Sequence, residues 1–125
     1  MKDRLHNCFT ELEVWKKTRV LKIVLIQLTK RFPAHEKFKL TDQIIKSSRS
    51  IGACVAEGYG RFSFKDQLHF CIMARGSLSE TLNHLFDCMD CNYLNEIEFN
   101  SLVNKIREIE KLLNGYISYL RKNIV

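Results

Sequence analysis

Two carboxylates near the middle of the sequence have the side-chain type that general acid–base catalysis requires. Glu57 precedes a glycine turn, and Glu80 lies in the helix expected after that turn. Two carboxyl groups can donate and accept protons when both face one substrate. The alternative is structural, because Arg49, Arg61 and Arg75 are placed to form ion pairs with them. The sequence ties no nucleophile or histidine to either carboxylate, so we favour ion pairs and expect no enzymatic activity.

A second group of residues has the types that bind metals. His84, Cys88 and Cys91 are spaced to share one helix face, and the two cysteines form a Cys-x-x-Cys pattern. A structural zinc site needs a fourth ligand, and a thioredoxin-like motif needs a preceding strand. Di-metal sites in helical bundles use two Glu-x-x-His motifs, whereas this chain has a single Asp66-x-x-His69. We therefore expect buried or half-exposed thiols, with no metal and no cofactor.

Basic residues form the third pattern with chemical meaning. The formal net charge is +6, and residues 16–61 hold 11 Lys or Arg against 3 Asp or Glu. Clustered cations bind phosphate backbones without a sequence code, whereas the alternative is a solvated face that maintains solubility. Tyr59 and Phe62 either stack on unpaired bases or pack on the end of the fold. The candidate nucleic-acid-binding residues are Lys16, Lys17, Arg19, Lys22, Lys30, Arg31, Lys37, Lys39, Lys46, Arg49 and Arg61.

Helices must position these residues, because apolar side chains recur at three- and four-residue steps along the chain. Helices are predicted over about 10–30, 40–57, 63–91 and 95–122. Capping boxes are predicted at Thr10 with Glu13 and at Asn95 with Glu98, and Ser63 is predicted to cap the third helix. A single proline and five glycines leave little room for the turns of a β protein. Residues 1–125 are therefore predicted to form one all-α domain, an antiparallel up-down-up-down four-helix bundle.

The first helix is more apolar than a surface helix needs to be. Its apolar positions include Val20, Ile23 and Val24 beside Leu21 and Leu25, which is wider than one stripe. A helix that is apolar on two sides is buried on two sides. We therefore expect the second side to form a subunit interface.

Three glycines are expected to have structural roles. Gly58 is predicted to end the second helix as a left-handed C-cap. Gly52 and Gly76 stand inside helices, where glycine costs about 1 kcal/mol relative to alanine. A packing reason is therefore expected at both positions.

The cysteine pattern and the first residues indicate a compartment. Five cysteines is an odd number, and residues 1–12 lack the apolar core of a signal peptide. Reduced thiols in a cytoplasm are therefore expected. No run of about 18 apolar residues is present, so no membrane span or membrane partner is expected.

Several short motifs occur in a specific order between residues 9 and 119. They are Phe32-Pro33 with Leu40 and Gln43, then Ser50-Ile51, Ala56-Glu57-Gly58, Arg61 and Gly76-Ser77-x-x-Glu80. This pattern resembles the 23S ribosomal RNA intervening-sequence protein family of bacterial four-helix-bundle proteins. Two positions depart from the family pattern, because Gly52 replaces a proline and Cys54 replaces an asparagine. The motif residues interpreted as structural are Ser50, Ile51, Glu57, Gly58, Arg61, Gly76, Ser77 and Glu80.

The resemblance implies a compact bundle that assembles as a ring-like homopentamer. The family is named for open reading frames within ribosomal RNA genes, which describes gene location and not an activity. A distantly similar basic bundle accompanies retroelement reverse transcriptases and binds nucleic acid, so RNA binding is our functional hypothesis by analogy. The alternative is a protein–protein adaptor or assembly factor, such as a reverse-transcriptase accessory protein, with no direct nucleic-acid role. Neither hypothesis requires a small-molecule substrate.

Overall fold

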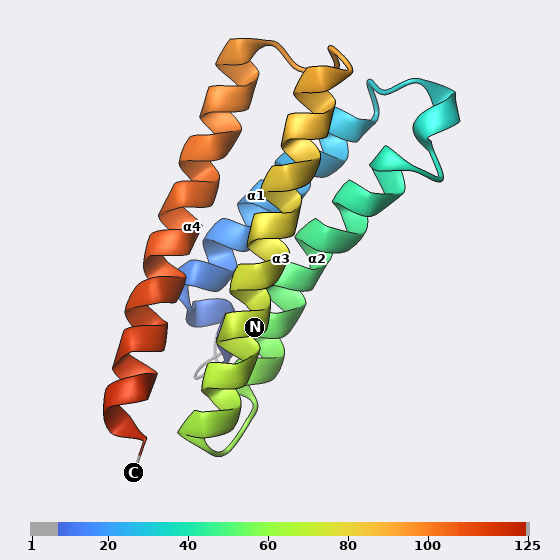
Figure 1. The fold of residues 1–125 in the computed structure, drawn as a ribbon. Coiled ribbons are helices and arrows are strands. Elements are labelled where there is room, and N and C mark those ends of the chain that lie inside the picture. Colours follow the sequence, from blue (N-terminus) through green and yellow to red (C-terminus); the bar gives the residue numbers. More distant parts are fainter. Residues whose placement is uncertain (1–7, 125) are drawn as a thin grey trace.

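A computed structural model describes residues 8–124, and four long helices dominate this range (Figure 1). They are α1 (Glu13–Thr29), α2 (Leu40–Tyr59), α3 (Phe64–Asp90) and α4 (Glu96–Asn123). The short 3-10 helices η2 (Phe9–Glu11) and η3 (Ala34–Glu36) precede α1 and α2. The predicted all-α class is confirmed, with helix ends shifted by up to three residues from the predicted ones.

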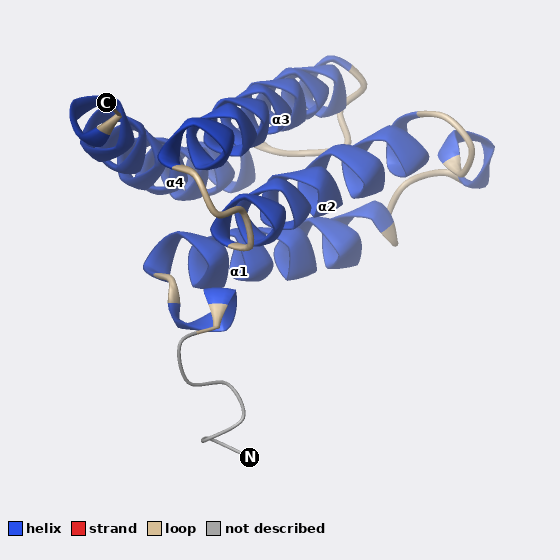
Figure 2. Cartoon of the chain, turned by 90° about the horizontal axis from the view of Figure 1, so that it is seen from below, coloured by secondary structure: helices blue, strands red, loops and turns tan. Residues whose placement is uncertain are grey.

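The four helices form an antiparallel up-down-up-down bundle. α1 packs against α2 and α4, and α3 packs against the same two helices. Seen along the bundle, α1 and α2 form one layer and α3 and α4 the other (Figure 2). The start of α1, the α2–α3 loop and the end of α4 lie at one end of the bundle (Figure 1). The α1–α2 connection and the α3–α4 turn lie at the other.

The core consists of aliphatic side chains that recur every three or four residues on each helix. This spacing puts them on one helix face, and burying such a face is what stabilises a bundle. The largest fully buried hydrophobic side chains are Leu21, Leu25, Ile44, Ile51, Leu78, Leu85, Ile109, Leu113, Ile117 and Leu120. On α4 the buried side chains are those of Leu102, Ile106, Ile109, Leu113, Ile117 and Leu120.

Small hydroxyl residues line the contact between α2 and α3. Ser50 Oγ and Ser77 Oγ lie 2.9 Å apart, and Thr81 Oγ1 lies 2.9 Å from Ser47 Oγ. Ser47 and Thr81 are buried, so each hydroxyl satisfies the other away from water. Short side chains at these positions allow the two helices to approach closely. Ser50 and Ser77 therefore form a polar contact between α2 and α3.

Gly58 is not the left-handed C-cap that its position suggested. α2 continues to Tyr59, and among the described residues no glycine has a positive φ. Gly58 is instead buried against α3, where an added Cβ would lie 2.9 Å from the Phe70 Cβ. Glycine at position 58 is therefore needed because α2 and α3 leave no space for a side chain there, and not because the backbone conformation requires it.

The two other helix glycines differ from each other. A Cβ added at Gly52 would lie 3.5 Å from Thr18 Oγ1 and 3.8 Å from Trp15 Nε1, an ordinary packing contact with α1. A Cβ added at Gly76 would meet nothing within 4 Å. The expected packing reason is therefore absent at Gly76 within the described chain.

Two of the three predicted helix starts have the expected caps. Ser63 Oγ accepts a hydrogen bond from the Asp66 backbone N–H, and Asn95 and Glu98 form a reciprocal capping box. The predicted capping box at Thr10 is wrong. The chain forms η2 there, and α1 begins at Glu13 after Leu12, which provides no side-chain cap.

Candidate nucleic-acid interface

The predicted basic residues occupy four parts of the fold and not one patch. Five belong to α1 and its C-cap, three to the connection before α2, two to α2, and Arg61 to the α2–α3 loop. The twenty residues of α2 span about 30 Å, at roughly 1.5 Å per residue. Arg61 is therefore at the opposite end of the bundle from Lys37 and Lys39. The structure does not bring all eleven side chains together.

Four of the eleven cations have acidic partners. Two of these ion pairs join residues four apart in the sequence, Lys46 with Asp42 at 2.9 Å and Arg61 with Glu57 at 2.7 Å. The other two connect helices far apart in the sequence, Lys17 with Glu108 at 3.1 Å and Arg31 with Glu98 at 2.6 Å. Exposed pairs of this kind contribute little to stability, but they reduce the charge offered to a ligand.

Arg31 is held more firmly than the other three. Its guanidinium donates to both carboxylate oxygens of Glu98, at 2.6 and 3.2 Å, and to the Tyr93 carbonyl at 3.0 Å. These bonds hold the pKa of Glu98 below its usual value, with a smaller effect from the Asn95 backbone N–H. Arg31 therefore ties the end of α1 to the α3–α4 turn, which is a structural role.

A second contact fixes the same end of the bundle. Tyr93 Oη donates to the buried Glu36 carboxylate at 2.8 Å, and the Phe32 and Tyr93 rings lie 4.8 Å apart. The carboxylate raises the pKa of Tyr93 to about 12, and burial adds to the effect. The connection between α1 and α2 is thereby anchored to the α3–α4 turn.

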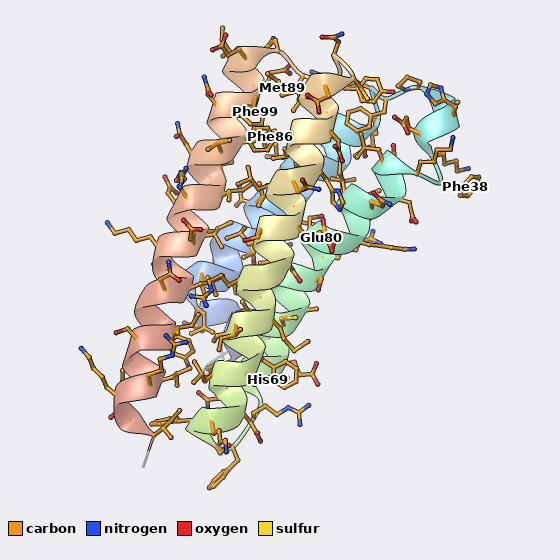
Figure 3. All side chains as sticks on the ribbon, in the orientation of Figure 1. Phe38, His69, Glu80, Phe86, Met89 and Phe99 are labelled. Carbon is orange, nitrogen blue, oxygen red and sulfur yellow. The ribbon has the colours of Figure 1, made fainter. Side chains whose placement is uncertain are left out.

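Two predicted cations rest on aromatic rings. The Arg19 guanidinium lies 5.8 Å from the centre of the Trp15 ring, and Lys37 Nζ lies 5.4 Å from that of Phe38. Phe38 projects from the connection that precedes α2 (Figure 3). Such contacts orient the cation but leave its charge in place.

Seven of the eleven cations make no ion pair within the described residues. All except Lys22 are exposed, and Lys22 is half-buried. Most of them lie on α1 or next to it, on the layer formed by α1 and α2. They are Lys16, Arg19, Lys22, Lys30, Lys37, Lys39 and Arg49.

The outer face of α1 is also apolar, as the sequence predicted. Val20 and Ile23 are 52% and 48% exposed, although Leu21 and Leu25 on the same helix are fully buried. A surface groove of about 650 Å³ runs beside these residues and is lined by Thr10, Glu11, Trp15, Lys16, Arg19, Val20 and Ile23. Cations and exposed aliphatic side chains therefore share this face.

The two carboxylates considered for catalysis are far apart. Ser50 contacts Ser77 and Ser47 contacts Thr81, which sets the register of the antiparallel pair α2 and α3. In this register Glu57 and Glu80 are separated by about ten residues along the bundle, or roughly 15 Å. Glu57 pairs with Arg61, and Glu80 lies midway along α3 (Figure 3). They do not form one acid–base pair.

The His84, Cys88 and Cys91 side chains do not converge either. Cys88 is fully buried, and burial raises the pKa of its thiol to about 12. Cys91 is exposed at the end of α3. His84 Nε2 lies 3.7 Å from a Glu80 oxygen, and its buried Nδ1 has no hydrogen-bond partner among the described residues. Among residues 8–124, no three His, Cys, Asp or Glu side chains lie close enough together to hold a metal ion.

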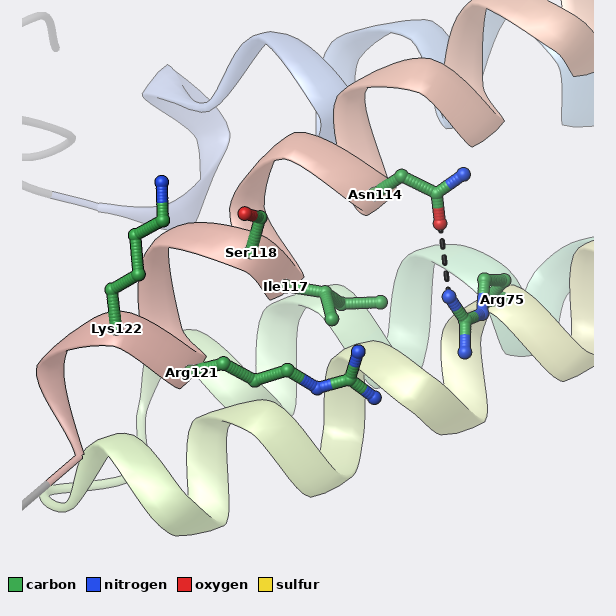
Figure 4. Close-up of a pocket in the computed structure, with 6 residues that line it drawn as sticks. All are labelled: Arg75, Asn114, Ile117, Ser118, Arg121 and Lys122. Atoms are coloured by element: carbon green, nitrogen blue, oxygen red, sulfur yellow. Dashed lines mark hydrogen bonds between the residues drawn. The ribbon is translucent and has the colours of Figure 1, made fainter.

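One basic groove was missed by the sequence analysis. It lies between α3 and α4, has a volume of about 550 Å³, and is lined by Arg75, Asn114, Ile117, Ser118, Arg121 and Lys122 (Figure 4). The spacing of 114, 118 and 121 on α4 is a helix-face pattern that could have indicated it. Arg75 was expected to form an ion pair with Glu57 or Glu80, but it donates to Asn114 Oδ1.

The profile of the family described as 23S rRNA-intervening sequence protein matches residues 10–115. The chain belongs to this family. It is also similar to a solved structure of a protein of unknown function from the S23 ribosomal protein family of Bacteroides thetaiotaomicron VPI-5482. The two are 28% identical with a TM-score of 0.76, and the match covers 83% of this chain and 97% of the other. No curated protein matches this chain.

The structure shows the neighbours of Gly52 and Cys54, the two residues at which this member of the 23S rRNA-intervening sequence protein family departs from the family pattern. Gly52 faces α1 at Trp15 and Thr18. Cys54 is buried, with its Sγ 3.8 Å from the Oγ of Ser50 on the same helix. No described helix has the length and apolar character needed to cross a membrane.

Proposed function

We propose that this protein is a non-enzymatic, self-associating, cytoplasmic RNA-binding protein. Its ligand contacts are phosphates, bound by cations of α1, of the α1–α2 connection and of α2. The observation that carries the proposal is the seven predicted cations without an acidic partner in the described chain, six of which are exposed. A phosphate backbone needs clustered cations and no particular base contacts. The net charge of +6 supports a polyanionic ligand.

Self-association is proposed to use the outer face of α1. Val20 and Ile23 are about half exposed and Val24 is 36% exposed, so a contiguous apolar strip faces outward. A second copy of the chain would cover it, and the family resemblance suggests five copies in a ring. Assembly would multiply the basic surface, so weak individual contacts would add up.

The same apolar strip favours one alternative function. A protein partner bound to Val20, Ile23 and Val24 would make the chain an adaptor or assembly factor without a nucleic-acid role. Salt separates the two functions, because phosphate binding weakens steeply with salt and apolar contacts do not. The experiment below therefore uses salt as its variable.

The test is binding of a short fluorescein-labelled single-stranded RNA, followed by anisotropy between about 50 and 200 mM salt. We expect binding at low salt with a steep negative dependence of log K on log salt. The triple variant Lys16→Gln, Arg19→Gln, Lys22→Gln should bind more weakly. Its slope should be shallower by about 2, since each lost contact to a single strand removes about 0.7.

The matched control removes three charges elsewhere. Lys105, Arg107 and Lys111 lie on α4, and their change to Gln lowers the net charge by the same amount. This control should bind RNA nearly as well as the unaltered chain. Absence of RNA binding at low salt would refute the proposal, and equal losses in the two variants would refute the assignment to α1.

A further inference from the structure

The groove between α3 and α4 is lined by cations and, among the described residues, by no carboxylate. Arg75 enters from α3 and Arg121 from the last turn of α4, whereas the side chain of Lys122, which also lines the groove, points away from these two arginines (Figure 4). Within the described chain, the other lining residues are Asn114, Ile117 and Ser118, and none is acidic. The groove therefore presents two arginines, with Lys122 at its edge, to any ligand.

Stabilisation of the fold does not account for all three cations. Arg121 and Lys122 lie where cations favour a helix C-terminus, because the helix dipole is negative there. Arg75 lies in the middle of α3, far from such an end, and donates to the neutral Asn114 Oδ1 at 3.0 Å. Glu110 lies one turn before Asn114 on α4, and its carboxylate is 3.8 Å from Arg107. The Arg75 guanidinium, a rigid fork of donors suited to phosphate, keeps its charge uncompensated.

An exposed aromatic side chain lies at the end of the bundle where α4 ends. Phe62 in the α2–α3 loop is fully exposed, and with Lys65, Asn123 and Ile124 it borders a hollow of about 360 Å³. Asn123 directly follows Lys122, so this hollow and the basic groove both involve the end of α4. Cations beside a free aromatic face are the combination that holds single strands, since phosphates pair with the cations and unpaired bases stack on the ring.

We propose that this groove and Phe62 bind a single-stranded segment of RNA, with Arg75 and Arg121 on its phosphates. This inference rests on the proposed function for its ligand class and adds a second contact region. The cations of α1 lie on the other layer of the bundle and serve any phosphate backbone. The groove and Phe62 prefer unpaired nucleotides, because a base within a duplex has no free face for the Phe62 ring.

The test compares a labelled single strand and a labelled hairpin at low salt. The variant Arg75→Gln, Arg121→Gln should bind the single strand at least tenfold more weakly, and Phe62→Ala should lose about tenfold on the single strand alone. The matched control Arg107→Gln, Lys111→Gln removes two α4 charges outside the groove and should change neither. Nitrogen-15 spectra should show the Arg75 and Arg121 Nε–Hε signals shifting on addition of the single strand.

The outcomes separate this inference from the proposed function. If the α1 triple variant weakens binding while the groove variants match the unaltered chain, the groove assignment is overturned and RNA binding stands. If the unaltered chain binds no RNA, titration with inorganic pyrophosphate tests whether Arg75 and Arg121 bind an anion. Shifts of Arg75 and Arg121 with pyrophosphate alone would overturn the single-strand ligand and leave a simple anion site.

Discussion

Arg31 and Lys30 are adjacent basic residues with different consequences for a ligand. The Arg31 guanidinium donates hydrogen bonds to Glu98 and to the Tyr93 carbonyl, and these contacts fix one end of the bundle. Lys30 is exposed at the end of α1 and has no acidic partner in the described chain. A phosphate can recruit Lys30 without breaking an existing bond. The partners of a side chain, and not its charge alone, decide whether it is available for binding.

The cysteines differ in the same way, and this difference predicts their reactivity. Cys88 is fully buried with a thiol pKa raised to about 12, whereas Cys91 is exposed. Since the thiolate is the reactive form, a pKa raised from 9.0 to about 12 lowers the thiolate fraction about a thousandfold near neutral pH. Iodoacetamide should therefore modify Cys91 rapidly and spare Cys88 in the native protein. Peptide mass spectrometry measures both.

A control and a pH effect accompany this prediction. In urea both thiols should react with iodoacetamide. In the variant Cys91→Ser, any labelling of the peptide that contains Cys88 in the native protein reports on Cys88. Because the raised pKa belongs to the folded state, Cys88 stabilises the fold fully below pH 9, and this contribution is lost between pH 9 and 12. Equal native labelling of Cys88 and Cys91 would show that α3 is not packed as described.

The pairing of α2 with α3 depends on small residues at specific levels. Ser50 meets Ser77, Ser47 meets Thr81, and Gly58 meets Phe70. The hydroxyl contacts satisfy polar groups inside the bundle, and Gly58 leaves space for the Phe70 Cβ of the next helix. Together these contacts set the register that places Glu57 and Glu80 far apart.

Replacing Gly58 should therefore destabilise the bundle. An added Cβ would lie 2.9 Å from the Phe70 Cβ, which is close to the backbone and cannot swing aside. We expect Gly58→Ala to lower the free energy of unfolding by about 1–3 kcal/mol. Gly115→Ala on α4 is the control, since nothing lies within 4 Å of the added Cβ. It should stabilise by about 0.5–1 kcal/mol through helix propensity; urea denaturation that gave both variants the same sign would contradict this packing.

The same helices show what the sequence can predict. Periodicity identifies all four, and Ser63 and Asn95 mark the starts of α3 and α4 because caps depend on residues close in sequence. The role of Gly58 depends on Phe70 of the next helix, so the local pattern suggested a C-cap instead. Thr10 carried a capping pattern, but the chain forms η2 there.

The candidate site was predicted less completely for a related reason. Lys17 pairs with Glu108 and Arg31 with Glu98, and both partners come from α4. No local pattern reveals which cation such a distant residue will neutralise. The groove of Arg75 and Arg121 likewise forms only when α3 packs on α4.

The bundle as a whole has two distinct charged surfaces and one apolar strip. The α1 face combines unpaired cations with Val20 and Ile23, and the α3–α4 groove holds Arg75 and Arg121. If copies join through the apolar strip, each assembly repeats the basic surfaces around its rim. Self-association and RNA binding are therefore expected to reinforce each other.

The most direct test is sedimentation velocity of the unaltered protein at micromolar concentration with a fluorescent single-stranded RNA. We predict a protein mass that is a multiple of the 14.7 kDa chain. The RNA should move with that oligomer at about 50 mM salt and be released by about 200 mM. A mass of one 14.7 kDa chain, or RNA that sediments alone at low salt, would contradict the account.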